Sequence, residues 1–262
     1  MLRIVDFNCD LGESFGAYTI GADAEMMGIV TSANVACGFH GGDPLVMERT
    51  VRLAREHGVG IGAHPGFPDL AGFGRREMRL SPDELRTAFI YQIGALTAFA
   101  HAQGTSVQHV KGHGALQNTA AYDETLSRAI VEAVASVDRR LIIVAFPDSV
   151  LARVARDAGL AVAREAFGDR GYTRNGKLVS RSHPLALVTD PEAVAHRVLR
   201  IATEGIVETV DGGEFRLEPD TICFHGDTPS APALARAARD VLARAGVRVA
   251  PLGQWLTQSF PA

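Results

Sequence analysis

The first residues of the chain alternate strictly between apolar and polar side chains. Over residues 4–11, the apolar positions are Val5, Phe7, Cys9 and Leu11, and the polar positions are Asp6, Asn8 and Asp10. Successive side chains of a β-strand point to opposite faces, so this alternation predicts a strand with one apolar and one polar face. Such a strand fits a sheet that helices cover on one side and that borders a polar ligand space on the other.

Predicted strands and helices alternate along the rest of the chain. Further strands are expected at residues 29–36, 59–63, 107–113, 141–146, 161–166, 221–225 and 247–252. Helices are expected at residues 44–57, 82–103, 123–137, 149–158, 191–203 and 228–245. The other segments are a long Gly- and Pro-rich loop at 65–79, a polar segment at 168–184 with a turn at Asn175-Gly176, and a hairpin or loop at 211–213. Alternation of this kind favours parallel strands joined by right-handed crossovers.

Histidine or aspartate stands beside glycine at the ends of five predicted strands. These segments are residues 6–13, 31–44, 60–66, 109–114 and 223–227. A β/α barrel collects its site from the carboxyl ends of several strands, whereas an open doubly wound sheet binds its ligand at one switch point. We therefore predict one α/β domain over residues 1–262, a β/α barrel of seven or eight strands whose ends converge on a polar site.

Composition narrows the classes of function. The chain has 262 residues, of which 47% are hydrophobic, enough for one large core. A net charge of −4 without a basic stripe argues against nucleic acid or an anionic membrane surface as a partner. No apolar run approaches the ~20 residues that span a bilayer, and the N-terminus has no signal-peptide pattern. Three widely spaced cysteines suit reduced thiols, so we expect a cytoplasmic protein.

Carboxylates and imidazoles recur at the predicted strand ends. The group comprises Asp10, Glu13, His40, Asp43, His64, His113, His225 and Asp227. Such side chains bind a divalent metal or act as general acids and bases. No pair has a compact zinc-ligand spacing such as HExxH, so a metal is possible but not specified, with Asp10, His40 and His64 as candidate ligands. Each histidine alone fits a structural role equally well, and Asp43 is explained as a helix N-cap.

Lys111 lies between His109 and His113 on one face of a predicted strand. Burying an ammonium is costly unless it is paired, so a carboxylate should face it, either from the protein (Asp10 or Glu165) or from a substrate. Two loop arginines, Arg170 and Arg181, are candidates to anchor a substrate carboxylate, or are solvated. The sequence has neither the GxxxxGK[ST] loop of ATP-binding proteins nor the GxSxG elbow of serine hydrolases.

Longer strings of sequence resemble the LamB/YcsF family, the A subunits of 5-oxoprolinase. The strings are residues 6–16, 31–44, 61–66, 68–70, 72–76, 91–96, 109–118, 165–172 and 225–229. The chain departs from the family pattern at Gly112, where proline is usual, and at Gln117, where tyrosine is usual. Both departures touch the strand that carries Lys111, so loop rigidity or substrate contacts are expected to differ there.

The resemblance implies a seven-stranded, TIM-like β/α barrel of the glycoside hydrolase and deacetylase type. It also implies hydrolysis of 5-oxo-L-proline to L-glutamate coupled to hydrolysis of ATP, with B and C subunits as partners. Because the chain has no nucleotide loop, ATP is expected to be bound by, or shared with, those subunits. Self-association of the chain stays open.

The expected roles follow from this reaction. A carboxylate or imidazole among Asp10, His64, His113 and Glu165 would act as base for the attacking water, and Lys111 would hold negative charge with Arg170 or Arg181. The expected substrate contacts are Glu13, Asn34, His40, Arg170, Arg181, His225 and Asp227. Two rival functions remain: a metal-dependent deacetylase or carbohydrate hydrolase on the same barrel, and a non-catalytic subunit that binds the lactam.

Overall fold

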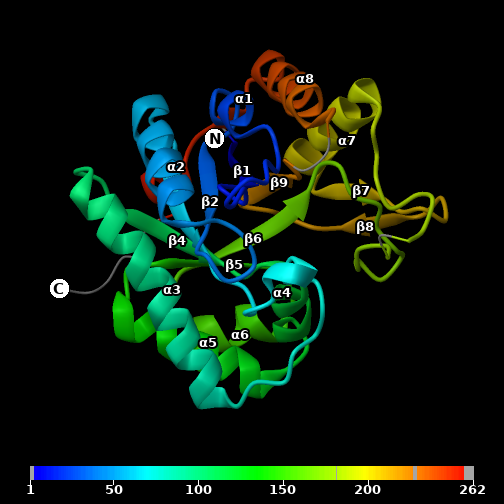
Figure 1. Ribbon diagram of the computed structural model, residues 1–262. Helices are drawn as coiled ribbons and strands as arrows, with labels where there is room; N and C mark the ends of the chain where they lie inside the picture. The colour runs from blue at the N-terminus through cyan, green and yellow to red at the C-terminus, as the bar shows by residue number, and fades with distance from the viewer. Residues whose placement is uncertain (1–2, 181, 227–228, 257–262) are drawn as a thin grey trace.

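Seven parallel strands close into a barrel at the centre of the structure (Figure 1). The computed structural model describes residues 3–180, 182–226 and 229–256. In order around the barrel the strands are β1 (Ile4–Leu11), β2 (Ser32–Ala36), β3 (Gly60–His64), β4 (Val107–Lys111), β5 (Ile142–Ala145), β6 (Val162–Phe167) and β9 (Thr221–Phe224). β9 pairs with β1 and closes the ring, and β10 (Arg248–Val249) pairs with the first residues of β1. The predicted seven-stranded barrel is confirmed.

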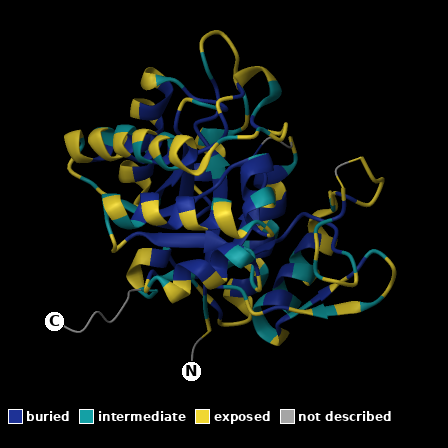
Figure 2. Cartoon of the chain, turned by 90° about the horizontal axis from the view of Figure 1, so that it is seen from below, coloured by how far each residue is buried: buried dark blue, intermediate teal, exposed yellow. Residues whose placement is uncertain are grey.

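Helices surround the barrel (Figure 1). They are α2 (Pro44–His57), α3 (Pro82–Ala102), α5 (Glu124–Val137), α6 (Val150–Asp157), α7 (Pro191–Glu204) and α8 (Ala231–Arg244). Their outer faces are exposed, whereas the strands between them are buried (Figure 2). Among the described residues no helix combines the length and the apolar character needed to cross a membrane.

Several short elements refine the sequence prediction. The patterns did not predict α1 (Asp23–Met27), α4 (Gly114–Ala120) or the 3-10 helix η1 (Leu70–Gly72) inside the long loop. The hairpin expected near residues 211–213 is present as the antiparallel pair β7 (Ile206–Glu208) and β8 (Glu214–Arg216), which extends away from the barrel (Figure 1).

Four predicted boundaries were too wide. β4 ends at Lys111 because His113 is already the N-cap of α4, and β2 starts only at Ser32. The last predicted strand shortens to β10, after which residues 252–254 form the 3-10 helix η2 (Leu252–Gln254). The last long helix begins at Ala231, and residues 227–228 lie outside the described part of the chain.

Asp43 caps α2 as predicted, accepting the backbone N–H of Val46 at 2.9 Å.

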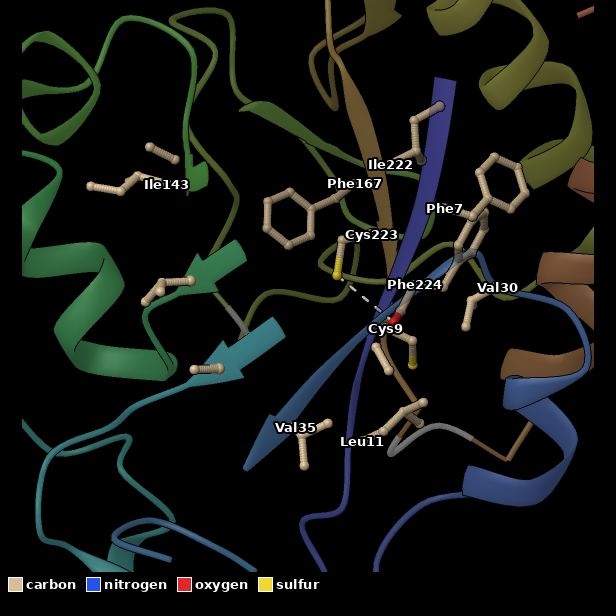
Figure 3. Packing of buried hydrophobic residues seen from close by; sticks show 14 of the residues in the cluster. Phe7, Cys9, Leu11, Val30, Val35, Ile143, Phe167, Ile222, Cys223 and Phe224 are labelled. Carbon is tan, nitrogen blue, oxygen red and sulfur yellow. Dashed lines mark hydrogen bonds between the residues drawn. The ribbon is translucent and has the colours of Figure 1, made fainter. Parts of the chain in front are cut away.

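The two faces of β1 have the environments that the alternation predicts. On the outer face Phe7, Cys9 and Leu11 are fully buried in the hydrophobic core, and the Phe7 ring packs 4.9 Å from that of Phe224 (Figure 3). On the inner face Asp6 accepts hydrogen bonds from the hydroxyls of Thr31, Ser32 and Thr221. The closing seam between β1 and β9 is therefore bonded from inside the barrel as well as through the backbone.

Glycine on β3 makes room for a polar side chain in the barrel. A β-carbon at Gly62 would overlap the ring of His109, which reaches across from β4. His109 Nε2 lies 2.7 Å from the amide oxygen of Asn34 on β2. Burial lowers the pKa of His109 to about 3, so its ring is neutral at physiological pH. The glycine thus lets a hydrogen-bonded imidazole replace the apolar filling that is usual in such barrels.

Replacing Asp6 with asparagine tests the seam network through its pH dependence. Complete burial raises the pKa of Asp6 from 3.8 to about 6, against the effect of its hydrogen-bond donors. The folded protein holds this proton more tightly than the unfolded chain, so ionisation of Asp6 lowers stability as pH rises through that interval. An asparagine does not titrate. The quantity to follow is the free energy of unfolding of Asp6→Asn minus that of the unsubstituted chain, measured by urea denaturation. We expect this difference to rise by about 3 kcal/mol between about pH 4 and pH 7. Parallel pH profiles would contradict a buried, titrating carboxyl at the seam.

Candidate active site

A cavity of about 550 Å³ opens at the carboxyl ends of the barrel strands. Its floor and walls include Asp10 of β1, Lys111 of β4, Glu165 and Phe167 of β6, and His225, which follows β9. The strand ends therefore converge on one polar site, as the sequence predicts. The volume suits a small substrate.

Lys111 is the charged centre of the cavity floor. Its ammonium lies 2.9 Å from Asp10 Oδ1 and 2.8 Å from Glu165 Oε1. It also donates to the amide oxygen of Asn8 at 3.2 Å and to the thiol of Cys223 at 3.2 Å. Burial alone would lower the pKa of Lys111, but the charges facing it, above all that of Asp10, raise the pKa well above its usual value. The lysine is therefore permanently charged and fixes two carboxylates from different strands.

Glu165 keeps unused hydrogen-bonding capacity. The residue is 1% exposed, and its Oε1 is paired with Lys111 at 2.8 Å, whereas Oε2 has no hydrogen-bond partner among the residues described. Burying an oxygen without a hydrogen-bond partner costs free energy. At a cavity wall, such a carboxylate oxygen is suited to accept a hydrogen bond from a ligand.

His225 and Asp169 form a pair on another wall. His225 Nδ1 lies 2.9 Å from Asp169 Oδ1, and the backbone N–H of His225 donates to Asp169 Oδ2 at 2.9 Å. The imidazole stacks on Phe167, with ring centroids 5.5 Å apart. Burial would raise the pKa of Asp169, but His225 and the hydrogen bonds from it hold the pKa below its usual value. The carboxylate fixes the orientation of the ring through Nδ1, so Nε2 is the nitrogen available to a ligand.

Four side chains gather beside Asp10: Glu13, His40, His64 and His113. All four are buried, and one possible ligand atom of each lies within 4.8 Å of the others, so the group could hold a metal ion. The rings of His40 and His113 stack with centroids 3.6 Å apart.

The pKa values of this group and of the adjacent Asp10 are strongly shifted. Burial would raise the pKa of Glu13, but the contacts of its carboxylate with the imidazoles of His113 and His40 lower it to about 2. Burial lowers the pKa of His40 to about 3 although Glu13 opposes the shift. For Asp10, the charges of His64 and Lys111 outweigh burial and hold the pKa well below its usual value. The carboxylates are ionised while His40 is neutral.

The structure brings most of the predicted site residues together. Those at the cavity are Asp10, Glu13, Lys111, His113, Glu165, Arg170 and His225. His64 lies directly behind Asp10, with Nε2 3.3 Å from Asp10 Oδ2. Arg170 donates to the backbone carbonyls of Ala186 and Val179, so its guanidinium also holds the loop after β6.

Two predicted substrate contacts lie deeper than expected. Asn34 and His40 are fully buried and do not line the cavity. Asn34 donates to Asp10 and Asn8, and His40 contacts Glu13, so both position cavity residues. Arg181 and Asp227 lie outside the described residues.

The structure changes the set of candidate metal ligands, and it shows the contacts of Gln117. Of Asp10, His40 and His64, the two histidines belong to the four-residue group, whereas Asp10 lies next to it and is held by Lys111. Gln117, one of the departures from the family pattern, lines the cavity and donates to the carbonyl of Val144 at 3.2 Å.

Sequence reasoning missed Asp169. It follows Gly168 immediately after β6, which is the same combination of strand end, glycine and acid that marked the other loops. The signal is therefore present, although the only prediction for residues 168–184 is a polar segment. Its partner His225 is 56 residues away, and no spacing rule connects the two.

Comparison with known proteins places these observations in a family. The sequence profile of the LamB/YcsF family matches residues 5–257. A protein of Thermus thermophilus that is named as the A subunit of 5-oxoprolinase is 54% identical, with 94% of this chain and 98% of that protein covered. The protein of the same name from Natranaerobius thermophilus is 48% identical over 98% of this chain and 100% of its own length.

Solved structures agree on the fold. A lactam utilization protein from Thermus thermophilus matches with a TM-score of 0.90 and 52% identity, covering 94% of this chain and 98% of that one. A peptidoglycan N-acetylglucosamine deacetylase domain from Eubacterium rectale matches with a TM-score of 0.51 and 12% identity, covering 100% and 91%. The second likeness concerns the barrel fold alone.

Removing the Lys111 charge should destabilise the barrel. Lys111→Met leaves Asp10 and Glu165 close together without a counter-charge, and breaking a buried ion pair in this way costs about 3–5 kcal/mol. We expect a loss of that size in the free energy of unfolding, measured by urea denaturation. The matched control is Lys177→Met, because Lys177 is exposed at the cavity mouth over the ring of Tyr122 and should contribute about 1 kcal/mol or less. Equal losses in the two variants would contradict the central position of Lys111.

Proposed function

This chain belongs to the LamB/YcsF family, and from that premise we propose that it is the A subunit of an ATP-dependent 5-oxoprolinase. The enzyme would open the lactam of 5-oxo-L-proline to L-glutamate while ATP is hydrolysed to ADP and phosphate. The observation that carries the proposal is the shared name of three relatives, each an A subunit of 5-oxoprolinase and 48–54% identical over nearly the whole chain. The small charged cavity supports it, because a polar five-membered lactam requires such a site.

The reaction needs an activating step. An unstrained lactam carbonyl is a poor electrophile, and transfer of the γ-phosphoryl group of ATP to the carbonyl oxygen, with ADP leaving, makes its carbon more reactive. Water then attacks that carbon, the ring C–N bond breaks to give the acyl phosphate, and a second water releases phosphate and glutamate. The sequence has no GxxxxGK[ST] loop, so ATP would be bound by, or shared with, the partner B and C subunits. The word "subunit" in the relatives' names supports an assembly.

Glu165 and Lys111 are suited to the lactam itself. The unpartnered carboxylate oxygen of Glu165 would accept the lactam N–H or the proton of the attacking water, while Lys111 balances its charge. Lys111 also supplies a fixed positive charge close to the point where negative charge develops on the carbonyl or phosphoryl oxygens.

His225 is suited to proton transfer on another wall of the cavity. Asp169 accepts the Nδ1 proton, so Nε2 carries the lone pair, and the carboxylate would stabilise the imidazolium that forms when Nε2 takes a proton. Asp10, His64 and His113 are further catalytic candidates. The remaining proposed substrate contacts at the cavity are Glu13 and Arg170. Arg181 and Asp227 stay sequence predictions, while Asn34 and His40 would act by positioning Asp10 and Glu13.

A second candidate function is a metal-dependent deacetylase or carbohydrate hydrolase. The specific observation in its favour is the buried group of one glutamate and three histidines beside the cavity. Such an enzyme would need neither ATP nor partner subunits, which makes the two candidates easy to separate.

Reconstitution tests the proposal directly. The chain is mixed with candidate B and C subunits, and glutamate formed from 5-oxoproline is followed with and without ATP and with each component omitted in turn. We expect glutamate only from the complete mixture with ATP. Glu165→Gln should lower kcat by about 10²-fold or more, as expected for loss of a proton-transfer group.

The control is His101→Ala, because His101 is exposed near the end of α3 and does not line the cavity. Its activity should match that of the unsubstituted chain. Acetate release from an N-acetylated sugar polymer without ATP would instead support the second candidate. Tight binding of 5-oxoproline, with turnover that Glu165→Gln and Lys111→Met leave unchanged, would identify a non-catalytic binding protein.

A further inference from the structure

The buried group of Glu13, His40, His64 and His113 consists almost entirely of hydrogen-bond acceptors turned toward one another. Its members come from four consecutive strand ends, those of β1, β2, β3 and β4. Acceptors that face one another in a buried space need a proton or a cation between them.

Backbone contacts fix the tautomers of two rings. His64 Nδ1 lies 2.8 Å from the carbonyl oxygen of Lys111, and His113 Nε2 lies 2.8 Å from that of Phe73. A carbonyl only accepts, so each of these nitrogens carries the ring proton. In the neutral rings, His64 Nε2 and His113 Nδ1 are therefore both lone pairs, yet they face each other at 3.0 Å. Two lone pairs at this distance repel unless a cation lies between them.

Carboxylates enlarge the set of acceptors. Glu13 Oε1 lies 3.2 Å from His113 Nδ1 and 3.2 Å from His40 Nε2. Asp10 Oδ2 lies 3.3 Å from His64 Nε2. His40 Nδ1 is buried without a hydrogen-bond partner in the described part of the chain. Without an ion, Glu13 accepts the Nε2 proton of His40, and an ion bound at Nε2 would move that proton to Nδ1. Two imidazole lone pairs, His40 Nε2 and one carboxylate oxygen thus point at the same small volume.

We propose that Glu13, His40, His64 and His113 bind one divalent transition-metal ion, of which Zn²⁺ is the model case. Tetrahedral Zn²⁺ with ligands at about 2.0–2.1 Å requires distances of about 3.3 Å between ligand atoms. The distances from His113 Nδ1 to His64 Nε2 and to Glu13 Oε1, and from Glu13 Oε1 to His40 Nε2, are 3.0–3.2 Å. Three imidazoles and a carboxylate favour zinc or a neighbouring transition metal over Mg²⁺ or Ca²⁺, which prefer oxygen ligands.

The surroundings are those of a ligand sphere. The ring protons that His64 and His113 donate to backbone carbonyls are the outer contacts that usually orient metal-binding histidines. Glu13 and His113 also line the cavity, so an ion held here would face a bound molecule and supply a Lewis acid for its carbonyl or for a water. These contacts favour a bound ion whether or not the cavity binds a lactam.

Metal content and cobalt spectra of the full chain test the site. Chelator-treated protein is titrated with Co²⁺, and visible d–d absorption and elemental analysis give the stoichiometry. We expect one ion per chain, displaced by Zn²⁺. His113→Ala should weaken Co²⁺ binding by about 10²-fold or more, and Glu13→Gln, which keeps the side-chain shape, by about tenfold or more. His101→Ala should bind as the unsubstituted chain does.

Two results would overturn the proposal. A folded chain that takes up neither Co²⁺ nor Zn²⁺ would mean that a shared proton lies between the imidazoles. Stoichiometric binding that His113→Ala and Glu13→Gln leave unchanged would place the metal elsewhere. Because the readout is metal content and colour, a failed glutamate assay has no bearing on it, and metal binding by itself would leave the lactam reaction undecided.

Discussion

Polar side chains inside the barrel are paired mainly with side chains on other strands, and the rest of the structure depends on these pairings. Water has little access to the interior, where an unpaired polar group is costly. Asp6 is bonded to hydroxyls from β2 and β9, Asn34 joins Asn8 and Asp10, and Lys111 joins Asp10 to Glu165. The network that closes the barrel is continuous with the one that sets the cavity floor, so stability and site geometry are determined by the same contacts.

The cavity divides into two chemically different halves. The ends of β1 to β4 carry the glutamate and three histidines, while the segments after β6 and β9 carry Asp169 and His225. Lys111 lies between them, with Asp10 on one side and Glu165 on the other. One half has ligand atoms suited to a cation, the other has an imidazole oriented by a carboxylate, and both border the cavity.

Much of this arrangement could be predicted from the sequence. The alternation over residues 4–11 defined the two faces of β1, and the recurrence of histidine or aspartate beside glycine located the strand ends that form the cavity. The resemblance to a family supplied the number of strands. The two short helices were missed because five or seven residues give too little periodicity, and α4 starts at a glycine that resembles a loop.

Pairings between distant residues could not be predicted in the same way. Spacing along the chain cannot show that Asp169 meets His225, or that Glu13 and His113 join the two histidines singled out as ligands. Nor could it show that Asn34 and His40 lie beneath the cavity, because depth depends on how strand registers stack residues in layers. Residue types at strand ends were predictable, whereas their mutual distances required the folded chain.

The closing seam has a consequence for the order in which the protein is made. Asn8 and Asp6 are bonded to Thr221, which lies 213 and 215 residues further along the chain. During synthesis from the N-terminus, β1 must wait for β9 before its inner face is complete, and such long-range pairings form slowly. The nascent chain therefore holds a carboxylate and an amide without their final partner until β9 has emerged. The cavity is enclosed only once β9 has paired with β1, because β9 leads directly into His225 on the cavity wall.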